Sequence, residues 1–145
     1  MTDDIRRRAA LLAEFFSHAP MKRTFGMTLS FDEAGDATFQ MPNNPDMHHS
    51  FRDTHGGVIA TLIDNAGWFT AATRYDFWVN TSELTVRLLE PANREPLIGR
   101  GTVIRAGGRL CVASMTVHSA SGRLVATGTG SFMVSSKRIA LPSKP

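Results

Sequence analysis

The sequence contains a single cysteine, Cys111, among 145 residues, and no long segment of like charge. One cysteine excludes an internal disulfide, so we expect a reducing compartment, the cytoplasm. Asp3 and Asp4 stand where a secretory signal peptide would carry basic residues, and we therefore expect no such signal. The three arginines at 6–8 leave a transit peptide as an alternative, against which the same acidic residues argue.

Charged residues make up 20% of the chain and hydrophobic residues 42%, which is typical of a globular protein. The net charge of +3 and a pI near 9.6 favour anionic partners. The basic residues are dispersed and aromatic residues do not alternate with them, so we predict no nucleic-acid partner. The length predicts one domain over 1–145, with an N-terminal helix in 1–20 and a frayed tail in 137–145.

Residues 55–75, HGGVIATLIDNAGWFTAATRY, form the most distinctive stretch. After two glycines it is apolar on nearly every face of a helix, and such a helix must be enclosed by other structure. Its length alone would suit a membrane span, but the central Asp64-Asn65 pair and the lack of flanking basic clusters favour burial inside protein. We therefore predict a long central helix and no membrane contact.

The rest of the chain has mainly the short apolar alternation of strands. Residues 25–41 predict two strands joined by a turn at 33–36, residues 81–91 predict one strand, and residues 96–136 predict three more. Cys111 is expected to face the core from one of them. The fold class is therefore α+β, with an antiparallel sheet wrapped round the long helix.

Asp64 and Gly56 are the leading candidates for chemistry. A carboxylate among apolar neighbours costs free energy unless it is paired or used. Gly56 and Gly57 let a ligand approach backbone N–H groups that have no intrahelical partner, and such a terminus can stabilise a carbonyl oxygen that gains negative charge. Gly56 and Asp64 are eight positions apart, which is about 12 Å along a helix axis. If both act on one substrate, they come from two subunits of a two-fold dimer.

Adjacent histidines, His48 and His49, precede His55 in a loop over 42–54 and suggest a metal site. Neighbouring loop residues rarely aim at one ion, and no cysteine is near. We therefore predict no metal.

The His55-Gly56-Gly57 motif, with an acid nine residues after the histidine, is followed by the segments ELTVRLLEPA, RAGGRL and GRLVATGTGSF. Together they strongly resemble the PaaI-type hotdog-fold acyl-CoA thioesterases over nearly the whole chain. The resemblance implies hydrolysis of an aromatic or short- to medium-chain acyl-CoA, with no cofactor beyond the CoA of the substrate. It also implies a homodimer at least, and commonly a homotetramer. Gly56 would bind the carbonyl, and Asp64 of the other subunit would act as general base or nucleophile, two roles between which the sequence does not decide.

The resemblance assigns further roles. His55 would brace the glycine turn rather than act as a base, and Gly57 would contact the substrate. Thr81 aligns with a hydroxyl residue near the acid, Ser82 is the alternative, and an ordinary strand hydroxyl is an equal possibility. His49, also predicted to contact substrate, stands where the family usually has asparagine. Position 52 is an arginine where the family usually has glycine.

A turn with two arginines resembles the family segment that lies along CoA, and we expect its glycine N–H groups to be open to phosphate. The predicted CoA contacts are Arg105, Ala106, Gly107, Gly108, Arg109 and Leu110. A simple hairpin with solvated arginines is the alternative.

Six aromatic residues could line an acyl pocket or belong to the core: Phe51, Trp68, Phe69, Tyr75, Phe77 and Trp78. Two other functions remain open. The unusual His49 and Arg52 keep a non-catalytic acyl-CoA or lipid binder possible. A hotdog dehydratase would need a histidine and an acid acting on a 3-hydroxyacyl group, and the motif spacing fits the thioesterases better.

Overall fold

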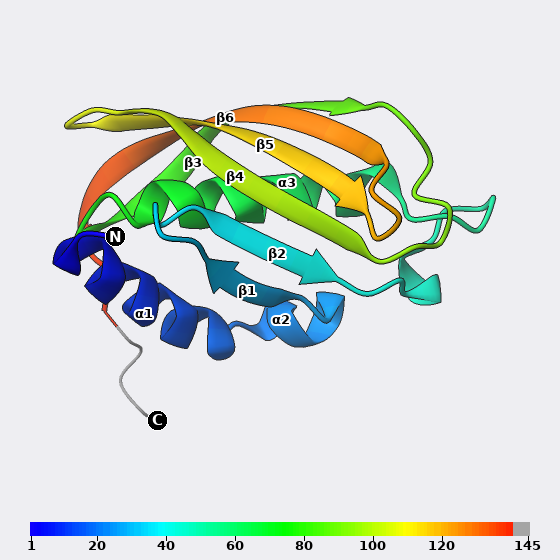
Figure 1. Ribbon diagram of the computed structural model, residues 1–145, viewed down its shortest axis with the longest axis horizontal. Helices are drawn as coiled ribbons and strands as arrows, with labels where there is room; N and C mark the ends of the chain where they lie inside the picture. Colours follow the sequence, from blue (N-terminus) through cyan, green and yellow to red (C-terminus); the bar gives the residue numbers. More distant parts are fainter. Residues whose placement is uncertain (141–145) are drawn as a thin grey trace.

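A computed structural model describes residues 1–140 and has one antiparallel sheet that curls round a long helix (Figure 1). The helices are α1 (Asp3–Ser17), α2 (Pro20–Phe25), the 3₁₀ helix η1 (Pro45–Met47) and α3 (Gly56–Ala72). The strands are β1 (Thr28–Phe31), β2 (Ala37–Met41), β3 (Phe77–Leu88), β4 (Leu97–Ala106), β5 (Leu110–Ser119) and β6 (Leu124–Arg138). Their order in the sheet is β1-β2-β4-β5-β6-β3. The six predicted strands and the enclosed central helix are confirmed.

Helix α3 lies close against the sheet because β4 carries glycines where the two meet. A Cβ at Gly101 would collide with the carbonyl oxygen of Ala66 and the hydroxyl of Thr70. A Cβ at Gly99 would lie 2.9 Å from Leu62. The helix can therefore bury residues on several of its faces, including Leu62, Ile63, Ala66 and Phe69. The residues of α3 that do not face the sheet, such as Asp64, stay partly exposed to solvent.

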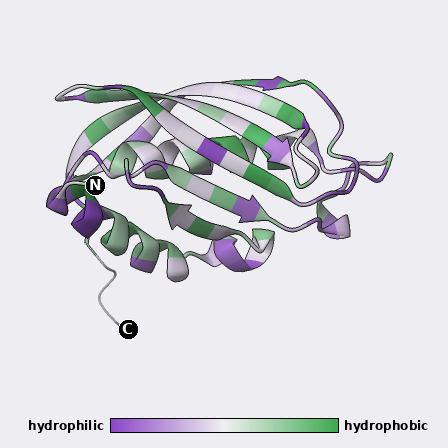
Figure 2. Cartoon of the chain, in the orientation of Figure 1, coloured by the Kyte–Doolittle hydropathy of each residue, from purple (hydrophilic) through white to green (hydrophobic). Residues whose placement is uncertain are grey.

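Buried and more exposed residues alternate most regularly along β5, and Figure 2 shows apolar and polar residues interspersed along the strands. On β5, Cys111, Ala113, Met115 and Val117 are buried, so the predicted core position of Cys111 is confirmed. The intervening residues lie on the outer surface of the sheet. This period of two is the physical basis on which the strands were predicted.

Helix α1 closes the core beside α3. Leu12 and Phe16 are buried, and the Phe16 ring meets Phe39 and Phe69 edge-on at 5.2 and 5.5 Å between ring centroids. Thr2 caps the helix, as its position before the acidic first turn predicts. Helix α1 ends at Ser17, inside the predicted helical segment 1–20, and a second short helix that was not predicted, α2, begins at Pro20.

Two boundaries differ from the sequence prediction. Strand β3 begins at Phe77 rather than at residue 81, because Phe77 pairs with Arg138 and Val79 with Val134 on β6. Strand β6 accordingly continues to Arg138, so the frayed tail expected from residue 137 does not begin there. The rest of that predicted tail, residues 141–145, lies outside the described residues.

The two edge strands differ in length. Strand β1 has four residues, whereas β3 has twelve and, in the described part of the chain, pairs on one side only, with β6. A long edge strand presents unpaired N–H and C=O groups to any second strand. Within residues 1–140, no helix is long and apolar enough to cross a membrane.

Candidate active site

Asp64 lies in the middle of α3, half-buried beside the first half of β3. Its Oδ1 accepts a hydrogen bond of 2.8 Å from the hydroxyl of Thr81 on β3. Burial raises the pKa of Asp64, and the Thr81 hydrogen bond partly offsets that rise. No basic residue among residues 1–140 forms an ion pair with it. A half-buried carboxylate held by a hydroxyl and lacking a cation is suited to accept a proton.

The N-terminus of α3 carries a free backbone donor. The Nδ1 atom of His55 accepts the N–H of Gly57 at 2.9 Å, so the His55 side chain caps the helix. The N–H of Gly56 donates to no protein atom in the described part of the chain. A Cβ on Gly56 would lie 2.6 Å from Leu88, so glycine keeps this approach open. The terminus thus offers one free N–H in the field of the helix dipole.

A groove of about 370 Å³ runs past this terminus. It is lined by Gly56, by His49 from the preceding loop and by the segment 88–92 after β3. Asp64 is not among its lining residues. Within one subunit, the structure therefore brings Gly56 and His49 together and leaves Asp64 about 12 Å further along the helix axis.

The two hydroxyls predicted near the acid lie apart. Thr81 reaches Asp64, whereas the Ser82 hydroxyl donates to the carbonyl oxygen of Ser131 at 3.0 Å. The pairing with β6 is irregular between Thr81 and Glu83, where Ser82 is the extra residue and its hydroxyl bonds β6 instead of the acid. The structure thus selects Thr81 as the neighbour of Asp64.

The 105–110 turn is a hairpin between β4 and β5 at the other end of α3. Its Arg105 and Arg109 side chains are exposed. The expectation that both glycine N–H groups are open is wrong for Gly107, whose N–H donates to the Leu110 carbonyl at 2.8 Å. The Tyr75 hydroxyl, just past α3, donates to the Gly107 carbonyl at 2.7 Å. The hairpin is therefore closed on itself and fastened to the helix end remote from Gly56.

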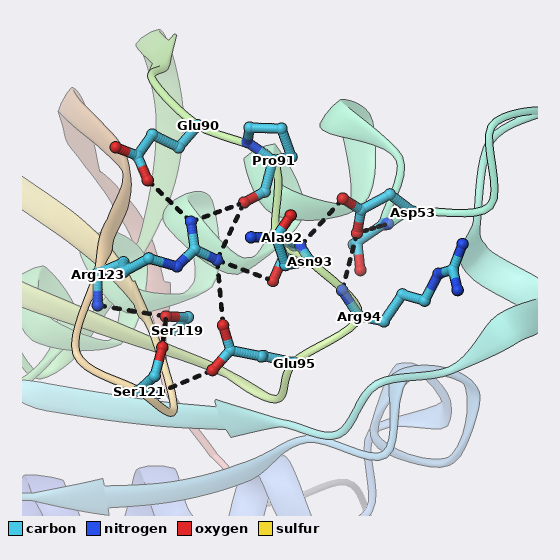
Figure 3. A network of polar contacts seen from close by, with 11 residues as sticks. Asp53, Glu90, Pro91, Ala92, Asn93, Arg94, Glu95, Ser119, Ser121 and Arg123 are labelled. Carbon is cyan, nitrogen blue, oxygen red and sulfur yellow. Dashed lines mark hydrogen bonds and ion pairs between the residues drawn. The ribbon is translucent and has the colours of Figure 1, made fainter.

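A network around Asp53 was missed by sequence reasoning (Figure 3). The Asp53 carboxylate accepts the backbone N–H groups of Thr54, Asn93 and Arg94 at 2.8, 3.0 and 3.1 Å. Burial alone would raise the pKa of Asp53, but these three N–H groups outweigh it and lower the pKa. Asp53 thus ties the loop before α3 to the loop between β3 and β4.

Three residues of this network have left-handed backbone: Arg52, Asn93 and Arg94, at φ 61°, 55° and 57°. That conformation costs roughly 1–2 kcal/mol for a residue with a Cβ, and it tends to occur at functional sites. At position 52 it also explains why glycine would suit this turn. Only Asn93, a residue type that tolerates this conformation, gave a sequence signal for it.

The six candidate aromatic residues divide between core and surface. Phe69 is buried, while Trp68, Tyr75, Phe77 and Trp78 are half-buried and Phe51 is 91% exposed. Trp68, one helical turn after Asp64, packs on Trp78 at 4.7 Å between ring centroids and donates its indole N–H to Val79. An aromatic wall therefore stands beside the carboxylate.

The described residues contain no group of three His, Cys, Asp or Glu that could hold a metal ion. His48 instead bonds Asn43 through Nε2 at 2.8 Å, and the Nδ1 atom of His49 accepts the N–H of Phe51.

A family model described as the thioesterase superfamily matches residues 51–126, more than half of the chain. The chain belongs to the thioesterase superfamily. This superfamily member is 28% identical over 137 residues to the medium/long-chain acyl-CoA thioesterase YigI of Escherichia coli K12. That match covers 83% of this chain and 88% of YigI.

Two solved structures place this superfamily member in the PaaI-type hotdog fold. The Escherichia coli PaaI protein of the phenylacetic acid degradation operon has a TM-score of 0.82 at 18% identity, over 94% of this chain and 97% of that one. The Bacillus halodurans BH2602 protein, solved with CoA, has a TM-score of 0.78 at 24% identity, over 93% of this chain and 91% of that one. The predicted hotdog fold is confirmed.

Proposed function

We propose that this chain hydrolyses acyl-CoA thioesters, with Asp64 as its catalytic carboxylate. The observation that carries this proposal is the setting of Asp64, which is half-buried, has no ion-pair partner among residues 1–140, and is held at one oxygen by Thr81. That setting raises the pKa of a carboxylate and leaves its second oxygen for a water or a substrate. A buried acid with only a structural role would more commonly be paired with a cation.

In the proposed reaction, the thioester carbonyl accepts the free N–H of Gly56. A water oxygen attacks the carbonyl carbon while Asp64 takes a proton from that water. The negative charge that develops on the carbonyl oxygen is stabilised by Gly56 N–H and the helix dipole. The C–S bond then breaks, and the CoA thiolate takes the proton back from Asp64. Direct attack by Asp64 is the alternative, and a single turnover in isotopically labelled water would leave label in the protein only in that case.

The Gly56 N–H and the Asp64 carboxylate are about 12 Å apart along one helix, so we propose that a second subunit completes each site. The free edge of β3 supports this arrangement because it lies beside Asp64. Antiparallel pairing of two β3 edges about a two-fold axis would set the two α3 helices side by side in opposite directions. The helix start of one subunit would then face the middle of the other helix. Assembly of such dimers into a tetramer rests on the family resemblance alone.

The substrate class rests on two relatives. YigI acts on medium- and long-chain acyl-CoA, and the BH2602 structure was solved with CoA. The relatives support the CoA part of the substrate. For the acyl part we propose an aromatic or short- to medium-chain group that lies against Trp68 and Trp78, of which only the medium chains are also named for YigI. These indole rings pack against each other at an interplanar angle of 55° and present an apolar surface.

The direct test is CoA release from short-, medium-, long-chain and aromatic acyl-CoAs by the wild-type protein and by Asp64→Asn. We expect the wild type to hydrolyse at least one class and Asp64→Asn to lose at least a hundredfold in kcat, the scale of general-base catalysis. A fully active Asp64→Asn protein would refute the mechanism. If neither protein hydrolyses any thioester while both bind CoA esters, the chain is a binding protein instead.

Mixed dimers test whether the site is shared. Gly56→Pro removes the free N–H at the first helical position, where proline is tolerated, and the extended backbone of His55 suits a following proline. Its Cβ would also press on the Leu88 side chain, so Gly56→Ala, which adds a Cβ and keeps the N–H, is the matched control. Gly56→Pro and Asp64→Asn dimers should each be inactive. After subunit exchange at equal concentrations, half of the dimers would hold one intact site, so about a quarter of wild-type activity should return. No recovery, with exchange verified by mass spectrometry, would place both groups in one subunit.

A further inference from the structure

The segment between β3 and β4 is fixed by a single arginine, Arg123, in the turn before β6. Its guanidinium bonds the carboxylates of Glu90 and Glu95 at 2.8 and 3.1 Å. It also donates to the carbonyl oxygens of Pro91 and Ala92 (Figure 3). A guanidinium presents its N–H donors in a rigid planar fork, so binding all of these acceptors leaves the segment little freedom. The segment therefore forms a firm support beside the start of α3.

Asp53 joins the loop before α3 to this support. Its carboxylate accepts the N–H groups of Asn93 and Arg94 at 3.0 and 3.1 Å. Its backbone carbonyl accepts the N–H of His49 at 2.9 Å. His49 comes from one loop and residues 88–92 from the other, and both line the groove at the start of α3. Asp53 therefore fixes the two loops that form the groove relative to each other.

The backbone path from Asp53 to the free N–H of Gly56 is short. Gly56 is the third residue after Asp53, and Thr54 between them is buried and donates its N–H to Asp53 Oδ1 at 2.8 Å. On the side of β3, the Leu88 side chain lies so close to Gly56 that a Cβ there would be 2.6 Å from it. A displacement of Asp53 would therefore move the Gly56 N–H relative to the groove.

The charge of Asp53 is maintained wherever the proposed reaction can run. Burial would raise the pKa of Asp53, but the N–H groups of Arg94, Asn93 and Thr54 outweigh it and lower the pKa. Burial raises the pKa of Asp64, which the reaction needs in its ionised form. Asp53 is therefore ionised at any pH at which Asp64 is ionised.

We propose that Asp53 is a positioning residue that holds the Gly56 N–H in place for the thioester carbonyl. It acts through the backbone of its loop and takes no part in proton transfer or bond formation. A donor stabilises the developing negative charge only if it already lies where the oxyanion will need it, and a misplacement of about 1 Å can cost about a hundredfold in rate. This inference rests on the proposed role of Gly56 as the donor to the carbonyl.

The kinetic test compares Asp53→Asn with Glu95→Gln. Asp53→Asn replaces an acceptor oxygen by an N–H donor, which weakens the tie to Asn93 and Arg94. The bond of 2.8 Å from Arg94 Nε to the Arg52 carbonyl still joins the loops, so we expect the variant to fold. Glu95→Gln is the matched control, because it removes a carboxylate of the same network that does not bond the loop before α3.

The expected effect of Asp53→Asn is on kcat. The Gly56 N–H stabilises the transition state more than the bound substrate, so kcat should fall about tenfold while KM stays within about twofold of the wild type. Glu95→Gln should retain the wild-type kcat.

A spectroscopic readout separates positioning from stability. The probe is an acyl-CoA analogue that cannot be hydrolysed, with a methylene group in place of the thioester sulfur and an isotopically labelled carbonyl carbon. Infrared difference spectra of its complexes report the carbonyl stretching frequency, which falls when the carbonyl accepts a hydrogen bond. We expect the same decrease with the wild type and Glu95→Gln, a smaller decrease with Asp53→Asn, and the smallest with Gly56→Pro.

The outcomes separate this inference from the proposed function. Equal frequencies for the wild type and Asp53→Asn, with a smaller decrease for Gly56→Pro, would overturn the role of Asp53 and leave that of Gly56 intact. Equal frequencies for the wild type and Gly56→Pro would show that Gly56 does not donate to the carbonyl, and both the proposed reaction and this inference would be wrong. Equal effects of Asp53→Asn and Glu95→Gln would also refute the inference, because they would reflect a general weakening of the network.

A second variant covers the case in which Asp53→Asn does not fold. Asp53→Ser keeps an acceptor for the N–H of Thr54 but is too short to reach residues 93 and 94. The same smaller decrease in carbonyl frequency is expected for it, and a wild-type frequency would overturn the positioning role.

Discussion

Removal of the Thr81 hydroxyl tests the proton-accepting role of Asp64. Thr81→Val keeps the shape of the side chain and deletes the 2.8 Å hydrogen bond to Asp64 Oδ1. Burial raises the pKa of Asp64 and this hydrogen bond lowers it, so the variant should have a higher Asp64 pKa than the wild type. Hydrogen bonds to charged groups contribute about 1.5–3 kcal/mol. Because Thr81 is exposed to solvent, we expect the lower end, about a tenfold change in proton affinity.

The sign of the effect on activity follows from the ionised form being the active one. As pH falls through the Asp64 pKa, the carboxylate is protonated and can no longer take a proton from water. A higher pKa moves this loss to higher pH. On the acid side of the profile, kcat/KM of Thr81→Val should therefore be about tenfold below that of the wild type, and the gap should narrow at alkaline pH.

The assay is kcat/KM for the best acyl-CoA over about pH 4 to 9. Thr81→Ser keeps a hydroxyl and should retain the wild-type profile. Ser82→Ala removes a hydroxyl that bonds Ser131 and not Asp64, so it should leave the profile in place too. Superimposable profiles for Thr81→Val and the wild type would refute the claim that this hydrogen bond sets the proton affinity of the catalytic carboxylate.

Two further predictions concern the scaffold. Gly101→Ala should lower the free energy of unfolding by about 1–3 kcal/mol in urea denaturation, since its Cβ would collide with α3. Gly108→Ala is the control and should change this free energy little, because no atom lies within 4 Å of its Cβ. Equal stability of the two variants would contradict the close packing of helix and sheet. Asp76→Asn should speed amide hydrogen exchange in α1 at neutral pH by up to about fivefold, because it removes the ion pairs of Asp76 with Arg8 and Arg7. These arginines lower the pKa of Asp76, so the difference between variant and wild type should persist until strongly acidic pH. Unchanged exchange would show that these ion pairs do not anchor α1.

The elements that sequence predicted well are those with a local signal. A helix that is apolar on all faces and strands with a period of two can both be recognised from residues close together in the sequence. The sequence therefore predicted α3 and the six strands. The first residues of β3 were not predicted as strand, because Phe77 and Trp78 were interpreted as aromatic residues of a pocket or of the core. Helix α2 has a signal at both ends, with Pro20 at its first turn and a left-handed Gly26 after its last residue, but its six residues are too short for periodicity.

The candidate site was predictable only where one residue stood out from its neighbours. Asp64 is the single acid in an apolar helix, and Gly56 follows a capping histidine. The Asp53 network had no such signal because its partners lie about 40 residues further along the chain. Left-handed backbone at Arg52 and Arg94 was equally hidden, since arginine is not a residue type that marks this conformation. Contacts between loops that are distant in sequence are decided by the sheet that brings them together.

Strand β3 connects the proposed chemistry to the proposed assembly. It supplies the Thr81 hydroxyl that holds Asp64, it carries Leu88 against Gly56, and its outer edge is unpaired along twelve residues. In the proposed dimer, pairing of that edge would remove further solvent from the carboxylate that burial already makes more basic. A monomer would then lack both the partner's Gly56 N–H and part of the desolvation that raises the Asp64 pKa. Catalysis would therefore depend on dimer formation twice over, once through the oxyanion site and once through the basicity of the acid.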